Sequence, residues 1–213
     1  MVNLLRRPLR YRYYYVTIIL IAVNLLAFLA TFYLPGGGRV ASLLAMYPDD
    51  VLQAGAWWQV VTYMFLHGSW SHIFWNMLAL FMFGIQLEKR MGSTEFLVYY
   101  LCTGIGAGIV TVLFNAATGQ GMIPVVGASG AIYAVLLGFA TYFPDARVFV
   151  FGLIPIRAPI LVVIYAGIEI VSQLASLRSG VAHLAHLAGL AFGFVYLAAR
   201  LGMNPVSIFL HRR

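Results

Sequence analysis

Six apolar runs, each bounded by charged or turn-forming residues, dominate the pattern of this 213-residue chain. They cover residues 16–34, 71–87, 94–116, 129–143, 155–177 and 183–201. Runs of this length suit helices that cross the roughly 30 Å hydrocarbon core of a bilayer. The pattern therefore predicts an all-α membrane protein with a bundle of six transmembrane helices.

The connection between the first two runs, residues 35–70, is long and amphipathic. It contains the stretch PGGG, two aspartates and the aromatic pair Trp57 and Trp58. Because tryptophan favours the membrane–water interface, we expect this loop to lie partly in the membrane surface. We expect one domain over residues 1–213, with a short basic N-terminus at 1–15 and a short basic tail at 202–213.

Composition excludes an ordinary soluble domain, since 62% of the residues are hydrophobic and only 9% are charged. The net charge of +7 could suggest nucleic acid as a partner. However, the basic residues form no patch interleaved with polar or aromatic side chains, so no nucleic-acid partner is expected. The single cysteine, Cys102, excludes an internal disulfide and is expected to fill a packing position.

The positive charges are better explained by topology. If both termini are cytoplasmic, eleven of the 13 basic residues lie inside and only Arg39 and Arg178 lie outside. The inside set is Arg6, Arg7, Arg10, Arg12, Lys89, Arg90, Arg147, Arg157, Arg200, Arg212 and Arg213. A cleaved signal peptide is disfavoured, because the first apolar run is too long and lacks a small-x-small cleavage site. We expect a bacterial inner-membrane protein, since the short termini carry no targeting extension.

Polar side chains inside spans are costly, so each one is a functional hypothesis. The candidates are His72, Asn76, Ser129, Glu169, His183 and His186. In the predicted topology all three histidines and the serine lie toward the outer side, where they could share one cavity.

Ser129 begins the short fourth run. Fifteen helical residues rise only about 22 Å, so the serine is expected below the outer surface. A recessed helix start must line a water-filled cavity. The free backbone N–H groups of the first helical turn could then bind an oxyanion there. The flanking Gly127 and Gly130 give the backbone freedom there.

His186 is followed by Gly189 and Gly193 at i+3 and i+7, on one stripe of the sixth run. Small residues on a stripe let helices approach closely. Close approach is what a hydrogen bond between His186 and Ser129 needs, and that bond would make the imidazole a general base. His72 and Asn76, four residues apart, project from one face of the second run.

Less specific interpretations exist for each residue. Ser129 could simply start a helix, and His186 could be a buried structural histidine. For His183 a structural role is weighed against tuning or competing with the base. Glu169 is interpreted as an interhelical hydrogen-bonding group or a protonated acid, not as a catalytic one. The glycines at 104, 106 and 108 are interpreted as one helix-packing face.

Other enzyme and transport classes fit less well. No H-E-x-x-H motif supports a metalloprotease, and none of the three aspartates lies in a span, as an aspartyl intramembrane protease requires. A transporter would be expected to show an inverted repeat and broken helices, which the sequence lacks.

Three motifs in order, HIFWN (72–76), GASG (127–130) and AHLAG (185–189), resemble the rhomboid intramembrane serine proteases. The resemblance extends over residues 16–201. It implies a six-helix rhomboid-like fold and cleavage of single-span membrane proteins within or next to their transmembrane helix. No metal or cofactor is expected. The alternative is a catalytically inactive rhomboid-like protein that binds membrane clients.

The resemblance also implies a role for individual residues. Ser129 would be the nucleophile and His186 the base, while His72, Asn76 and the Ser129 backbone N–H would hold the oxyanion. Supporting roles would fall to Tyr133, whose ring packs on the catalytic histidine, to Gly84 and Glu88 as a structural brace, to His67 as a structural residue, and to Gly127, Gly130, Gly189 and Gly193.

Two departures from the family pattern stand out. Gln59 follows Trp58 where relatives often have arginine, so the contacts of the first loop are expected to differ. No acidic residue is predicted beside the histidine, since Asp145 and Glu169 are assigned to the cytoplasmic side or to the fifth span. The sequence therefore predicts a Ser-His dyad oriented by packing.

Overall fold

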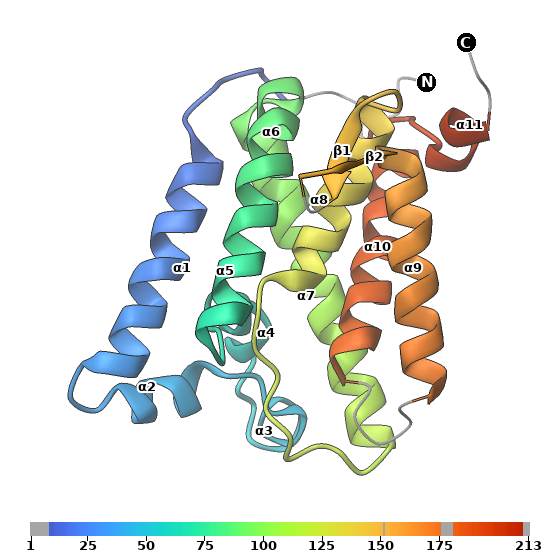
Figure 1. The fold of residues 1–213 in the computed structure, drawn as a ribbon. Helices are drawn as coiled ribbons and strands as arrows, with labels where there is room; N and C mark the ends of the chain where they lie inside the picture. The colour runs from blue at the N-terminus through green and yellow to red at the C-terminus, as the bar shows by residue number, and fades with distance from the viewer. Residues whose placement is uncertain (1–8, 151, 176–180, 211–213) are drawn as a thin grey trace.

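A computed structural model describes residues 9–150, 152–175 and 181–210. The described chain is mostly helical, with one antiparallel hairpin (Figure 1). The elements are α1 (Val16–Tyr33), α2 (Gly37–Leu44), α3 (Pro48–Gln53), α4 (Gln59–Thr62), η2 (Tyr63–Phe65), α5 (Trp70–Ala79), η3 (Leu80–Gly84), α6 (Ile85–Met91), α7 (Ser93–Ala117), α8 (Ser129–Tyr142), β1 (Arg147–Val150), β2 (Ile154–Arg157), α9 (Ala158–Ala175), α10 (Val181–Ala199) and α11 (Pro205–Leu210).

The long helices stand side by side, while α2, α3 and α4 lie at one end of the bundle and the hairpin and α11 at the other (Figure 1). The short helix α8 is central: it packs against α7, α9 and α10, and most of its residues are buried. A helix that is apolar all round belongs inside such a bundle. Its N-terminus, which carries Ser129, therefore lies within the protein.

Three helices, α1, α7 and α9, are long and apolar enough to cross a membrane, and α8 and the stretch His183–Ala199 of α10 are shorter apolar segments. The protein is thus an integral membrane protein. The second predicted run corresponds to the consecutive helices α5, η3 and α6, where η3 is a π-helical turn. Six crossings and a surface position for the first loop stay predictions.

Two regions, the hairpin and the tail, differ from the all-α, six-run sequence prediction. Residues 154–157 form strand β2 instead of the start of the fifth helix, and β2 pairs with β1. Branched residues such as Val148 and Ile156 favour strands, and Gly152, at φ 72°, permits the turn between them. The tail also contains a short helix, α11, beginning at Pro205, a favoured first helical residue.

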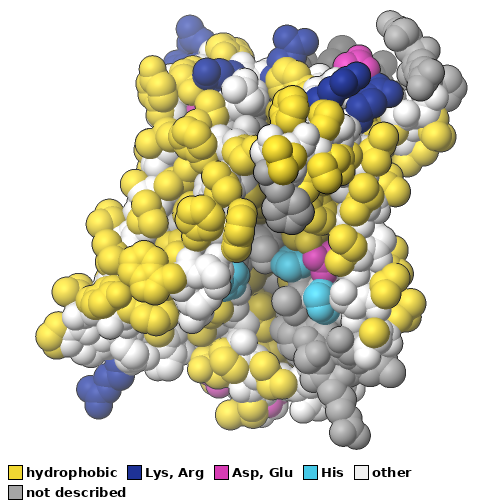
Figure 2. Space-filling model, viewed as in Figure 1, with side chains coloured by type: hydrophobic (Ala, Val, Ile, Leu, Met, Phe, Trp, Pro, Cys, Tyr) yellow, Lys and Arg dark blue, Asp and Glu magenta, His cyan; other side chains and the backbone are white. Residues whose placement is uncertain are grey.

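In this view the described basic side chains gather mainly at the end of the bundle that holds the hairpin and α11 (Figure 2). That this end faces the cytoplasm stays a prediction. Arg6, Arg7, Arg178, Arg212 and Arg213, which also belong to that prediction, lie outside the described residues.

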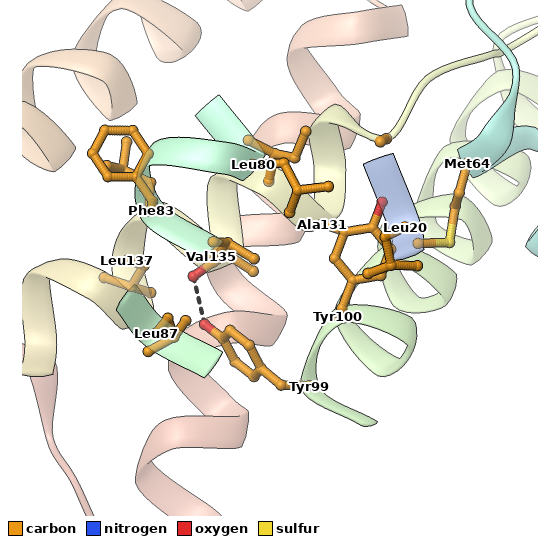
Figure 3. Close-up of a cluster of buried hydrophobic side chains, with 14 of the residues drawn as sticks. Leu20, Met64, Leu80, Phe83, Leu87, Tyr99, Tyr100, Ala131, Val135 and Leu137 are labelled. Atoms are coloured by element: carbon orange, nitrogen blue, oxygen red, sulfur yellow. Dashed lines mark hydrogen bonds between the residues drawn. The ribbon is translucent and has the colours of Figure 1, made fainter. Parts of the chain in front are cut away.

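The core lies where α1, the α5–η3–α6 stretch, α7 and α8 meet (Figure 3). Buried hydroxyl groups there bond to backbone oxygens. Tyr99 donates to the Ala134 carbonyl at 2.6 Å, and Tyr63 donates to the Gly104 carbonyl at 2.7 Å. These bonds satisfy polar groups that lipid could not, and they fix α8 and η2 against α7.

The three glycines of α7 do not form one face, contrary to the prediction. A Cβ on Gly104 would lie 2.1 Å from Met64, and one on Gly108 would lie 2.9 Å from Tyr63. A Cβ on Gly106 would instead meet the Phe192 ring of α10 at 2.7 Å. Residues two apart point to opposite sides of a helix, so these glycines serve two different contacts.

Glu88 braces the start of α1. Its carboxylate accepts hydrogen bonds from the backbone N–H groups of Val16 and Thr17, at 2.7 and 2.8 Å, and from the hydroxyls of Thr17 and Ser93. A negative charge at a helix N-terminus is favourable, because the first N–H groups there have no partner within the helix. Gly84, one turn earlier, leaves room for Thr17: a Cβ would lie 2.9 Å from its methyl group.

Gln59 organises the first loop through the side-chain amide. Its Oε1 accepts from the Tyr47 backbone N–H at 2.9 Å, and its Nε2 donates to the Leu43 carbonyl at 3.4 Å. The neighbouring Trp58 indole donates to the same carbonyl at 3.0 Å. A neutral amide thus ties α2 to α4 at the position where the resemblance implied an arginine.

Candidate active site

Ser129 is the first residue of α8, and Ala128 precedes it as the N-cap. The Ser129 hydroxyl therefore makes no capping bond; it lies 2.7 Å from Nε2 of His186 on α10. Gly127 turns the chain into the helix at φ 126°, a conformation that L side chains rarely adopt. The helix-start interpretation thus does not account for the serine.

The approach of α10 to α8 is close enough to require glycine. A Cβ on Gly189 would lie 2.0 Å from the Gly130 carbonyl oxygen, and one on Gly193 would lie 2.9 Å from the Ala134 Cβ. The two helices therefore touch backbone to backbone one turn beyond His186. This contact explains how residues 57 positions apart come within hydrogen-bond distance.

The His186 ring is held on its face by Tyr133. The two rings stack with their centroids 4.4 Å apart and only 9° between their planes. Tyr133 lies one turn after Ser129 on α8, so the same helix carries the serine and the surface against which the imidazole packs.

Glu169 of α9 corrects the sequence prediction that no acidic residue lies beside the histidine. Its carboxylate is buried and contacts Nδ1 of His186 at 2.9 Å. It also contacts Nδ1 of His183 at 2.5 Å and accepts a hydrogen bond from the Tyr133 hydroxyl. The predicted interhelical hydrogen bond of Glu169 is confirmed, but the statement that no third acidic group is available was wrong.

The same cluster contains the one set of three potential metal ligands found among the described residues. The ligand atoms of Glu169, His183 and His186 all lie within 4.8 Å of one another. However, the carboxylate oxygens already pair with both imidazoles at hydrogen-bond distance.

His72 and Asn76 reach the cavity from α5. Gly68 N–H points to Nδ1 of His72 at 3.4 Å, which leaves Nε2 to carry the ring proton. That nitrogen and the Ser129 hydroxyl lie 2.7 and 3.8 Å from where a Gly127 Cβ would be. The Asn76 amide donates one hydrogen to the His72 carbonyl at 2.8 Å, and its second hydrogen remains for another acceptor.

A cavity of about 1120 Å³ joins these residues. Ser129, His186, His72 and Asn76 line one part of it. From there it extends between α5 and α9 to the hairpin, along mostly apolar side chains that include Trp75, Ala79, Met82, Phe149, Leu161 and Tyr165. In the view of Figure 2 the surface has a hollow near its middle, with histidine and acidic side chains at the edge of the hollow.

His67 lies beside this site and is not one of its lining residues. It is 3% exposed and its ring contacts that of His72 edge-on, with centroids 4.9 Å apart. Burial, and secondarily the His72 imidazole, lower the pKa of His67 to about 3. The ring is therefore neutral at physiological pH, which suits the structural role implied by the resemblance.

The fold and the site together define an integral membrane protein whose apolar helices hold a serine and a histidine at the wall of a cavity, with a carboxylate beside the histidine. Residues 54–202 match the Rhomboid domain, and the chain belongs to the rhomboid family.

Individual relatives support this membership. The chain is 28% identical over 195 residues to Rhomboid protease GluP of Bacillus subtilis, covering 91% of this chain and 36% of that protein. It is 29% identical over 145 residues to RHOMBOID-like protein 4 of Arabidopsis thaliana, covering 68% of this chain and 34% of that protein. It is also 30% identical over 134 residues to Rhomboid protein 1, mitochondrial, of Saccharomyces cerevisiae, covering 62% of this chain and 38% of that protein. The chain thus spans about a third of the length of these relatives.

Proposed function

We propose that this protein is an intramembrane serine endopeptidase that cleaves single-span membrane proteins within or next to their transmembrane helix. The observation that carries the proposal is the 2.7 Å contact between the Ser129 hydroxyl and the His186 Nε2, at the wall of a cavity inside the bundle. A hydroxyl bonded to an imidazole is the arrangement that activates serine as a nucleophile.

The reaction follows from this geometry. Ser129 Oγ attacks the scissile carbonyl carbon while His186 Nε2 takes the hydroxyl proton. The oxyanion that forms is stabilised by His72 Nε2–H, the Asn76 amide and the backbone N–H of Ser129 at the α8 N-terminus. His186 then gives its proton to the leaving amine. Water, activated by the same imidazole, releases the acyl group.

The substrate helix reaches Ser129 through the part of the cavity between α5 and α9, whose lining is apolar. Segments with Gly, Pro or small polar residues unwind most easily and are expected to be preferred. In the proposed topology both termini are cytoplasmic, the membrane is the bacterial inner membrane, and the site opens toward the outer side.

The experiment that tests this proposal is cleavage of a single-span reporter by the purified protein in liposomes, with a fluorophosphonate probe added in parallel. Wild type is expected to cut the reporter and to become labelled, and Ser129→Ala is expected to do neither. Cleavage that persists in Ser129→Ala would remove the serine from the mechanism. Failure of wild type to cut any of a panel of reporters, with no labelling, would favour the client-binding alternative.

The route between α5 and α9 makes a separate prediction. Ala79→Trp would place an indole in the cavity wall. Because the substrate helix must fit there, the rate of reporter cleavage should fall at least about tenfold, while a small fluorophosphonate should still label Ser129 at nearly the wild-type rate. Phe74→Trp, at a position 57% exposed on the same helix, is the matched control and should change neither rate. Equal loss of cleavage and labelling in Ala79→Trp would indicate a damaged site and not a blocked route.

A further inference from the structure

Ser129, His186 and Glu169 form an unbroken chain of contacts across three helices. Oγ of Ser129 lies 2.7 Å from Nε2 of His186, and Nδ1 on the other side of the ring lies 2.9 Å from Oε1 of Glu169. We propose that Glu169 is the third member of a Ser-His-Glu triad, a positioning residue that orients His186, and that His183 in turn anchors Glu169. This inference rests on the proposed protease function.

The carboxylate selects the tautomer of the imidazole. An ionised carboxylate only accepts hydrogen bonds, so Nδ1 of His186 must carry a proton to pair with it. Nε2 then has a free lone pair facing the Ser129 hydroxyl. That is the tautomer a general base requires, and the opposite one could not remove the proton.

The same contact stabilises the charge that forms during the reaction. When the Ser129 O–H bond breaks and Oγ bonds to the substrate carbon, the proton moves to Nε2 and His186 becomes positively charged. Nδ1–H of the imidazolium then points at the negative charge of Glu169, which keeps its own charge throughout. The side chain of Glu169 is only 7% exposed. In such low-dielectric surroundings the attraction between the carboxylate and the imidazolium is strong, and it stabilises the charged intermediate.

Glu169 is itself held in place through both oxygens. Oε1 accepts a hydrogen bond from the Tyr133 hydroxyl and also contacts His186 Nδ1. Oε2 contacts His183 Nδ1 at 2.5 Å. An ionisable group inside a membrane bundle needs such partners, and here they come from α8 and α10. Fixing both oxygens prevents the carboxyl group from rotating away from the imidazole, which gives His183 a function that the reaction alone does not assign.

Metal coordination by the same three side chains fits less well. Two ligand atoms each about 2.0–2.1 Å from a tetrahedral zinc ion lie roughly 3.4 Å apart. The observed separations of 2.5 and 2.9 Å between carboxylate oxygens and imidazole nitrogens are those of hydrogen bonds.

The test is steady-state cleavage of a single-span reporter in liposomes by Glu169→Gln, Glu169→Asp and His183→Gln, with kcat and KM determined separately. Gln keeps the shape of Glu169 without its charge, so kcat should fall about a hundredfold or more with KM within about twofold. Asp keeps the charge on a shorter stem and should recover part of kcat relative to Gln. His183→Gln leaves the Glu169–His186 pair in place and should lower kcat only about threefold to tenfold.

Glu95→Gln is the matched control, because Glu95 is another buried glutamate with a tyrosine and a basic partner, Tyr196 and Arg200. Glu95 contacts the end of α10 opposite to His183 and His186. The Glu95→Gln variant should therefore lose thermal stability without a loss of kcat. If Glu169→Gln does not fold, the Asp and His183 variants decide the matter.

Several results would overturn the inference while leaving the protease intact. One is Ser129-dependent cleavage with kcat of Glu169→Gln within about threefold of wild type, and another is Gln retaining as much kcat as Asp. Loss of wild-type cleavage in EDTA, restored by zinc, would replace the triad with a metal site. Absence of Ser129-dependent cleavage in wild type would instead contradict the proposed function itself.

Discussion

Ser129→Ala, His186→Ala and the double variant are expected to cleave a single-span reporter at one common residual rate, about a thousandfold or more below wild type. The reason is that the two side chains perform a single step. Without the imidazole the hydroxyl keeps its proton, and without the hydroxyl the imidazole has nothing to activate. The measurement is kcat in liposomes for wild type and the three variants, with EDTA present throughout.

Ser42→Ala removes an exposed hydroxyl outside the site and serves as the control for the chemical change, with kcat expected at the wild-type value. The double variant is the informative one. If the rate of the double variant fell below wild type by the product of the two separate losses, Ser129 and His186 would act independently. The 2.7 Å contact between them would then not be the catalytic bond.

The contact between Ser129 and His186 could be predicted because it depends on the spacing of glycines along the sequence near each residue. Glycines at i+3 and i+7 after His186 mark a stripe without side chains, and Gly130 follows the serine directly. Helical periodicity turns such spacing into a face, and small residues on a face predict close contact. The structure has that contact at Gly189 and Gly130.

The position of Glu169 could not be predicted in the same way, because it depends on how α9 is rotated and how far it is shifted along α10. Neither quantity is encoded in spacing along one helix. One physical signal was available: a lone carboxylate in an apolar span must find donors on a neighbouring helix. His183 and His186 were candidate donors on the next span. Because a buried carboxylate without partners is unfavourable, this signal would have favoured a carboxylate paired with these histidines over a protonated Glu169.

The hairpin was missed for a different reason. Residues 147–157 are as hydrophobic as the spans on either side, and hydropathy does not separate a short strand from the beginning of a helix. Branched side chains alternating around Gly152 were the local signal for strands. Val148, Phe149 and Val150 of the hairpin line the cavity between α5 and α9, which is the proposed route of the substrate helix.

Gly189→Ala should damage the protein more than a single methyl group usually does. The added Cβ would lie 2.0 Å from the Gly130 carbonyl oxygen and 2.7 Å from its carbon, and backbone atoms in a buried helix cannot move aside cheaply. We expect α10 to be pushed away from α8, at a cost of about 3 kcal/mol in stability. Because His186 lies one turn before Gly189, its contact with Ser129 should lengthen, and kcat should fall about a hundredfold.

Gly167→Ala is the matched control for Gly189→Ala, since Gly167 also lies within a helix and a Cβ there would meet nothing within 4 Å. It should unfold at the wild-type temperature or slightly above it, because alanine favours the helix. Thermal unfolding in detergent, the fluorophosphonate labelling rate and kcat should be measured for both variants. If Gly189→Ala matched wild type in all three, the backbone contact between α8 and α10 would not be what brings His186 to Ser129. A loss of stability with labelling unchanged would separate the packing of the two helices from the alignment of the reacting groups.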